Sequence, residues 1–220
     1  MWKRSMKVKN FNFRKFHDDR KKFLRENKDE SFVIESGNIP FIVSAPHGVS
    51  QVRLGKSKFK EPGSLSLALD VAKRTGAHLI AKTRNCNDDA NFEEICPYKE
   101  ELKRYINAND IKFLIDFHGM KKSRNIDVEL GTNLGQNIKA NEKLFDFLCY
   151  NLKNDGFIVE VDQPFKASSK SVAGQVAKDC GIWTIQMEVN YKYTMDKKYQ
   201  DKLIEIINCV VDTIEKACKK

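Results

Sequence analysis

Short apolar runs alternate with longer amphipathic segments along most of the chain. Runs of four to eight apolar, β-branched residues predict buried strands, and apolar spacings of three and four predict helices. The expected strands are residues 31–36, 40–48, 77–83, 111–119, 126–132, 157–164 and 182–190. The expected helices are residues 63–76, 97–110, 141–156, 169–181 and 196–220. This alternation predicts a three-layer α/β/α domain with a largely parallel sheet.

The composition is that of a globular protein with more charge than average. The chain has 220 residues, of which 41% are hydrophobic and 31% charged. No stretch approaches the length of a transmembrane helix, and the first residues lack the apolar core of a signal peptide, so we expect a cytoplasmic protein. The six cysteines show no CxxC spacing, and in such a compartment they are expected to be reduced thiols.

The positive charge is concentrated at the start of the chain. Residues 1–30 carry eleven basic and five acidic side chains, which is +6 of the total +9. We therefore divide the chain into a basic extension, 1–30, and a single α/β domain, 31–220. The extension contains Phe11, Phe13, Phe16 and Phe23, which predict that it packs on the domain. Its charge is consistent either with polyanion binding or with a solvated amphipathic helix. Nucleic acid is the less favoured partner, because no helix-turn-helix or stacking-aromatic pattern accompanies the charge.

Two histidines close apolar strands, and each is followed by glycine. His47 ends PFIVSAPHG and His118 ends IKFLIDFHG, in a chain with only four histidines. Because the carboxyl ends of parallel strands form the binding edge of a sheet, two imidazoles there indicate a metal site. A hydrogen-bonded structural role is the alternative for each.

Further polar residues follow the other expected strands or lie in nearby loops. They are Glu61, Arg84, Asp88, Asp89, Asn91, Asp116, Asp162, Lys166, Glu188 and Asn190. Two imidazoles and a carboxylate can bind zinc with one position left for water, a second carboxylate can act as a base, and a cation can hold an anionic substrate. These are the groups that a metallohydrolase requires.

The ordered motifs resemble the N-formylglutamate amidohydrolase family. The motifs are SAPHG, the glutamate of EPGS, GAHLIAKTR with DDANF, IDFHGM, DVELGT, QPFK and IQMEVNYKY, over roughly residues 38–196. The separated His and Glu also look like those of poly-γ-glutamate hydrolases. The resemblance implies a zinc carboxypeptidase-like fold with a mixed sheet flanked by helices.

The resemblance also implies roles for individual residues. It makes His47, Glu61 and His118 the ligands of one Zn²⁺ and Glu188 the general base. Glu61 has an alternative interpretation, because its loop is rich in lysine and can be a solvated charge cluster.

Other candidates follow from position and chemistry. Asp116 lies two residues before His118 on the same strand face, so it either orients that imidazole or is a buried acid with a structural role. Arg84 suits a substrate carboxylate, because guanidinium binds it bidentately. Lys166 matches a basic position of the family, and Asn91 matches its asparagine. The alternative interpretation of Arg84 and of Lys166 is an ordinary surface charge.

The chain departs from the family pattern where the substrate is recognised. Phe92 follows Asn91, where the family has arginine, and the glycines after QPFK are replaced by Ala167, Ser168 and Ser169. Both changes leave the expected metal ligands intact and make N-formylglutamate itself doubtful as the substrate.

The leading hypothesis is a zinc-dependent amidohydrolase that acts on a small acidic N-acyl amino acid or a γ-glutamyl-type amide. The alternatives are a polyanion-binding protein that uses residues 1–30, and an inactive relative that binds a ligand without turnover. A cysteine nucleophile is the weakest option, with Cys86 beside Arg84 the only candidate. The sequence leaves the oligomeric state, the substrate and the choice among divalent metals open.

Overall fold

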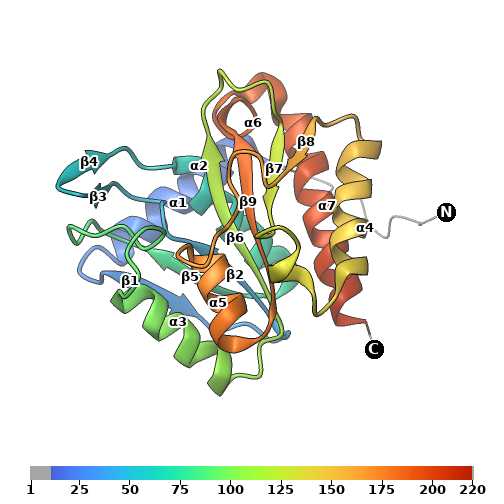
Figure 1. Cartoon of the computed structure of the whole chain (residues 1–220). Helices are drawn as coiled ribbons and strands as arrows, with labels where there is room; N and C mark the ends of the chain where they lie inside the picture. Colours follow the sequence, from blue (N-terminus) through green and yellow to red (C-terminus); the bar gives the residue numbers. More distant parts are fainter. Residues whose placement is uncertain (1–10, 220) are drawn as a thin grey trace.

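A mixed seven-stranded sheet forms the centre of the molecule (Figure 1). The computed structural model describes residues 11–219. In sheet order, the strands are β1 (Phe32–Glu35), β5 (His78–Lys82), β2 (Phe41–Ala45), β6 (Phe113–Met120), β9 (Trp183–Asn190), β7 (Val128–Gly131) and β8 (Val159–Val161). The pairs β1–β5 and β7–β9 are antiparallel, and the other neighbours are parallel. The predicted mixed and mostly parallel sheet is confirmed.

Helices cover both faces of the sheet, as the alternating pattern predicts. The helices are α1 (Phe13–Glu26), α2 (Pro62–Thr75), α3 (Pro97–Ala108), α4 (Glu142–Asn154), α5 (Val172–Cys180), α6 (Tyr191–Met195) and α7 (Gln200–Cys218), with short 3₁₀ turns at Gln136–Ile138 and Lys197–Tyr199. One hydrophobic core joins α1, α2, α4 and α7 to one face, and a second joins α3 and α5 to the other. Along β2, Phe41 and Val43 enter the first core and Ile42 the second, because successive side chains of a strand point to opposite faces.

The central strands are buried on both faces, which explains their continuous apolar runs. Every residue of β2, β5 and β9 is buried. Trp183 at the start of β9 is fully buried and packs edge-on against Phe113 of β6. Parallel strands that are covered by helices on both sides have this composition.

The helix ends follow local signals in the sequence. Pro62 and Pro97 occupy the first turns of α2 and α3, where a missing N–H costs nothing. Gly76 ends α2 with a φ of 76°, a left-handed conformation that glycine adopts without strain. Asn141 and Ser171 cap α4 and α5, since each side chain accepts a hydrogen bond from the backbone N–H three residues later.

The sequence patterns missed a small hairpin. Strands β3 (Gln51–Arg53) and β4 (Lys56–Lys58) pair with each other and project from the body on the side of β1 and α3 (Figure 1). They are only three residues long and carry few apolar side chains, so alternation gives no signal for them.

Helix α1 belongs to the same core as the rest of the molecule. Its Phe16 and Phe23 are buried, and Phe11 and Phe13 pack against the same cluster at its edge. Its basic side chains pair with acids one turn away, as in Lys15 with Asp19 at 2.7 Å. The first ten residues of the predicted basic extension lie outside the described residues.

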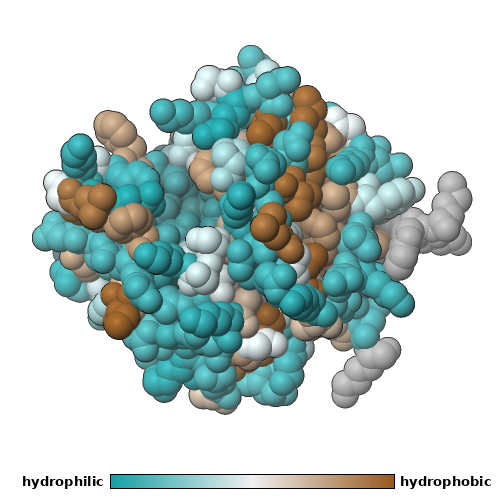
Figure 2. All heavy atoms as spheres, in the orientation of Figure 1, coloured by the Kyte–Doolittle hydropathy of each residue, from teal (hydrophilic) through white to brown (hydrophobic). Residues whose placement is uncertain are grey.

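The surface seen in Figure 2 is mostly hydrophilic, and its hydrophobic residues form a few small groups. Among residues 11–219, no helix has both the length and the apolar character needed to cross a membrane.

The contribution of α1 to stability can be measured at one side chain. Replacing the buried Phe23 by alanine removes a ring from the core and should lower the free energy of unfolding by about 3 kcal/mol. Phe59→Ala is the matched control, because that ring is 96% exposed and its loss should change stability by less than about 0.5 kcal/mol. Urea denaturation followed by circular dichroism measures both. Equal stabilities for the two variants would show that α1 adds nothing to the fold.

Candidate metal centre

Three predicted metal ligands meet beyond the carboxyl ends of two central strands. His47 follows β2, His118 lies near the end of β6, and these strands are parallel neighbours. Glu61 is the residue immediately before α2, and its backbone N–H donates to the carbonyl of His47 at 2.8 Å. That hydrogen bond brings the chain back to the strand end after the hairpin. The fold therefore places Glu61 beside both histidines, although it is 14 residues from the first and 57 from the second.

The carboxylate of Glu61 lies between the two imidazoles. Its Oε1 is 3.0 Å from Nδ1 of His47, and its Oε2 is 3.1 Å from Nδ1 of His118. The rings are nearly perpendicular, with centroids 4.7 Å apart. One ligand atom from each of the three residues lies within 4.8 Å of the others. Within the described part of the chain, this is the one group of three or more His, Cys, Asp or Glu side chains close enough to hold a metal ion.

A buried carboxylate holds the other nitrogen of each ring. Nε2 of His47 is 2.8 Å from Oδ1 of Asp89, and Nε2 of His118 is 3.0 Å from Oδ2 of Asp116. Both carboxylates are fully buried. A carboxylate that accepts from one ring nitrogen leaves the lone pair of the other for a metal, which is the usual surrounding of a metal-bound histidine. The donor set therefore fits a divalent ion bound through both Nδ1 atoms and Glu61.

The buried charges shift the pKa values of this cluster. Burial alone would lower the pKa of both histidines, but the neighbouring carboxylates of Glu61, Asp89 and Asp116 raise them above the ordinary value. Burial likewise opposes ionisation of Glu61, yet the two imidazoles hold its pKa far below the usual range. Burial also opposes ionisation of Asp89, but His47 and Arg53 lower the pKa of this carboxyl group below its usual range.

The predicted base, Glu188, lies directly beside His118. The two residues are register partners on the parallel strands β6 and β9, and Glu188 is 4% exposed. Gln186 donates from Nε2 to Oε1 of Glu188 at 3.0 Å. The pKa of Glu188 is raised to about 7, chiefly by burial and also by the nearby carboxylates of Glu61 and Glu129, while the two histidines oppose the shift. A carboxyl group with this pKa can both accept and donate a proton near neutral pH.

Asn91 supports this arrangement through protein contacts. Its Nδ2 donates to Oε1 of Gln186 at 3.2 Å, and its Oδ1 accepts from the backbone N–H of Val172 at 2.8 Å. The sequence predicts that Asn91 binds substrate. In the structure it lines the cavity, while its amide is used to join Gln186 to the start of α5.

These groups open into a cavity of about 400 Å³. Its lining residues are His47, Arg53, Lys58, Glu61, Asn91, His118, Pro164, Phe165, Lys166, Ala167, Ser168, Ser171, Gln186 and Glu188. Lys166, predicted to bind substrate, is among them, and its side chain is exposed. Arg84 is exposed and is absent from the lining, as is Cys86. The arginine that reaches the cavity is Arg53.

Sequence reasoning assigned no role to three of the site residues. Asp89 stood among several polar residues of its loop, and its contacts with His47 and Arg53 distinguish it from Asp88, which pairs with Lys82. Arg53 lies in the hairpin that the patterns missed. Gln186 precedes Glu188 by two residues on a buried strand. This spacing places both side chains on one face, and it could have identified Gln186 as a neighbour of Glu188.

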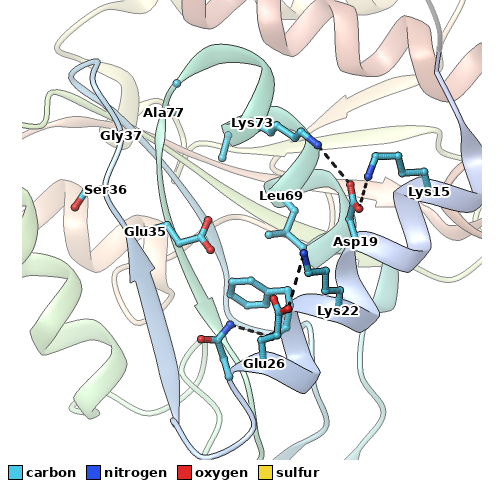
Figure 3. A pocket seen from close by; sticks show the side chains of 14 residues that line it. Lys15, Asp19, Lys22, Glu26, Glu35, Ser36, Gly37, Leu69, Lys73 and Ala77 are labelled. Carbon is cyan, nitrogen blue, oxygen red and sulfur yellow. Dashed lines mark hydrogen bonds and ion pairs between the residues drawn. The ribbon is translucent and has the colours of Figure 1, made fainter.

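A larger hollow elsewhere lacks this chemistry. It measures about 560 Å³ and lies between α1, α2 and the end of β1 (Figure 3). Its lysines pair with neighbouring acids, as Lys15 and Lys73 do with Asp19. Its lining contains no histidine or cysteine. Among the described residues, the side chains that could together hold a metal ion therefore lie in the smaller cavity.

The role of Asp116 can be tested without changing its shape. Asp116→Asn replaces an acceptor with an amide that no longer favours the required form of His118, so the affinity for a divalent ion should fall about 10- to 100-fold. Competition between the protein and a chromophoric chelator for Zn²⁺ measures this affinity. Asp110→Asn is the control, since Asp110 is 85% exposed in the turn that precedes β6. An unchanged affinity in Asp116→Asn would contradict the assigned role.

Comparison with known proteins supports the fold. No protein-family profile and no curated protein sequence matches the chain. Among solved structures, N-formylglutamate amidohydrolase from Ralstonia eutropha JMP134 superposes with a TM-score of 0.58 at 14% identity, over 84% of this chain and 98% of that one. A bacteriophage poly-γ-glutamate hydrolase gives 0.52 at 15% identity, over 88% and 94% of the two chains. A metallo-carboxypeptidase from Burkholderia cenocepacia gives 0.53 at 11% identity, over 91% and 69%. The chain therefore has the carboxypeptidase-like fold that these amidohydrolases and carboxypeptidases share, as its motifs predict.

Proposed function

We propose that this protein is a zinc-dependent amidohydrolase that cleaves the amide bond of a small acidic N-acyl amino acid or γ-glutamyl-type substrate. The observation that carries the proposal is the convergence of His47, Glu61, His118 and the buried Glu188 on one cavity. The names of the solved structures with this fold, an amidohydrolase, a poly-γ-glutamate hydrolase and a carboxypeptidase, are consistent with it.

Zinc is the metal that the donors favour. Two imidazole nitrogens and one carboxylate are the protein ligands of many catalytic zinc sites, which keep a further position open. When bound, the ion lowers the pKa of water and polarises a carbonyl group. Glu61, His47 and His118 would hold it, and Asp89 and Asp116 would keep the imidazoles oriented.

Glu188 is the residue that moves the proton. Its carboxylate lies at the site edge of β9, beside His118, and Gln186 holds one of its oxygens. We assign it to accept a proton from the attacking water and to return that proton to the nitrogen of the departing amine. Its raised pKa suits both steps, because a base near neutrality can also act as an acid.

The cavity favours an anionic substrate. Three cationic side chains, Arg53, Lys58 and Lys166, line it together with the acidic groups of the metal and proton-transfer sites. At about 400 Å³ it accepts a ligand of amino-acid or dipeptide size. The exposed Arg84, assigned to the substrate from sequence, lies outside this lining.

Removal of the base is the first test of the mechanism. Glu188→Gln keeps the size of the side chain and cannot accept the proton, so hydrolysis of N-acyl glutamates by the zinc-loaded protein should fall at least about 100-fold. Glu160→Gln on β8 is the control, because that side chain is exposed and outside the cavity. Release of the free amine, followed by a fluorogenic reagent, measures the rate. Full activity in Glu188→Gln, with normal metal content, would disprove the assignment.

Metal content gives an independent test. We expect a single Zn²⁺ per chain by plasma mass spectrometry, lost in His118→Ala because one imidazole ligand is removed. His17→Ala should retain the metal, since His17 lies on α1 among Phe13 and Phe16. Chelation should abolish hydrolysis and added Zn²⁺ should restore it. No metal in the wild type after reconstitution would overturn the proposal. Metal binding without turnover of any acidic amide would support the inactive, ligand-binding alternative instead.

A further inference from the structure

We propose that Arg53 is the residue that binds a carboxylate of the substrate, and that Asp89 and Phe92 hold its guanidinium in position. This inference rests on the proposed function, since it assigns the substrate-binding residue of the same site. It differs from the expectation based on sequence, which gave that role to Arg84.

The hairpin that carries Arg53 is tied to the metal site at its base. Strands β3 and β4 connect His47 to Glu61, and the two ends of this excursion are joined by the hydrogen bond from Glu61 N–H to the carbonyl of His47. The backbone N–H of Val52 also donates to the carbonyl of Asp88 at 3.2 Å. Arg53 therefore enters the cavity from a segment whose start and end are both metal ligands.

One carboxylate links the guanidinium to the metal site. Nε and Nη2 of Arg53 lie 2.9 and 2.8 Å from Oδ2 of Asp89, while Oδ1 of the same carboxylate is 2.8 Å from Nε2 of His47. Asp89 is fully buried and Arg53 is 30% exposed. The position of the guanidinium is thus fixed relative to His47, a requirement for any group that aligns a substrate with the reacting centre.

The ring of Phe92 supports one face of the same guanidinium. The Cζ atom of Arg53 is 4.9 Å from the ring centroid, within the range of a cation–π contact. Phe92 stands where the family that the sequence resembles has an arginine. In this chain the residue at that position instead contacts an arginine supplied by the hairpin.

Arg53 keeps donors for a ligand. Guanidinium has five N–H groups. Asp89 accepts from Nε and Nη2, and Nη1 has no hydrogen-bond partner among residues 11–219. The planar group matches a carboxylate in a way that an ammonium does not. The other two cations of the lining are lysines, and Lys166 is exposed, so Arg53 is the cation best held for specific recognition.

Ligand binding distinguishes this role from a purely structural one. The experiment uses zinc-loaded protein with Glu188→Gln, to prevent hydrolysis, and titrates N-acetyl-L-glutamate or its diamide by calorimetry. We expect the acid to bind more tightly than the diamide. Arg53→Gln should weaken binding of the acid about 10- to 100-fold, the effect of losing a charged hydrogen-bonded pair, and change binding of the diamide less than about twofold.

Two comparison variants test whether the position of the charge matters. Lys56→Gln removes a positive charge from the same hairpin at an exposed side chain outside the cavity lining and should leave both affinities unchanged. Arg84→Gln tests the competing assignment. Phe92→Leu should produce a smaller loss for the acid than Arg53→Gln, since Asp89 still holds the guanidinium.

Each outcome separates this inference from the proposed function. If Arg53→Gln weakens binding of the acid and of the diamide equally, or if the variant loses its zinc, Arg53 only holds Asp89 and the inference is overturned. Loss of acid binding in Arg84→Gln but not in Arg53→Gln would overturn it as well, as would an absence of acid binding to the parent protein. Selective acid binding through Arg53 without amide hydrolysis by the wild type would retain the inference and reject the hydrolase.

Discussion

The site depends on a buried network in which every ionisable group has a partner. Glu61 lies between two imidazoles, and each imidazole is held from behind by a fully buried carboxylate. Burial of any one of these groups without the others would be costly, because an unpaired charge in the protein interior loses its hydration. The network therefore sets the orientation of both rings as a unit. It also turns both Nδ1 atoms toward the carboxylate of Glu61, so one ligand atom from each of the three residues lies within 4.8 Å of the others.

The sheet provides the frame for this network. Strands β2, β6 and β9 are parallel neighbours, so the residues at their carboxyl ends share one edge. The register of β6 and β9 pairs Asp116 with Gln186 and His118 with Glu188. The carboxylate that holds His118 therefore lies beside the glutamine that holds the proposed base, Glu188. Most residues of β6 and all residues of β9 are buried, so the polar side chains at this edge stand on strands that are packed by the core.

One short loop connects the candidate metal site to the arginine proposed to bind the substrate. Asp89 holds His47 and Arg53, Asn91 holds Gln186 and the start of α5, and Phe92 supports Arg53. These three residues of one loop thus contact a proposed metal ligand, the glutamine that holds the proposed base, and the arginine proposed to bind the substrate. Substitutions in this loop are expected to affect metal affinity and specificity together, because the contacts share side chains.

Local features of the sequence were sufficient for the layers, for the strands of the central sheet and for the edge at which the two histidines meet. Apolar runs ended by His47 and His118 located the edge of the sheet, and a spacing of two placed Asp116 on the face of His118, where the two are 3.0 Å apart. The roles of Asp89 and Arg53 were decided only by tertiary structure. Asp88 and Asp89 are adjacent and chemically identical, yet one pairs with Lys82 and the other with His47. Arg84 and Arg53 differ in the same way, since one is exposed and the other enters the cavity. Periodicity reports which face of a strand or helix is buried, but the path of a loop or short hairpin depends on contacts with distant residues, which no local pattern contains.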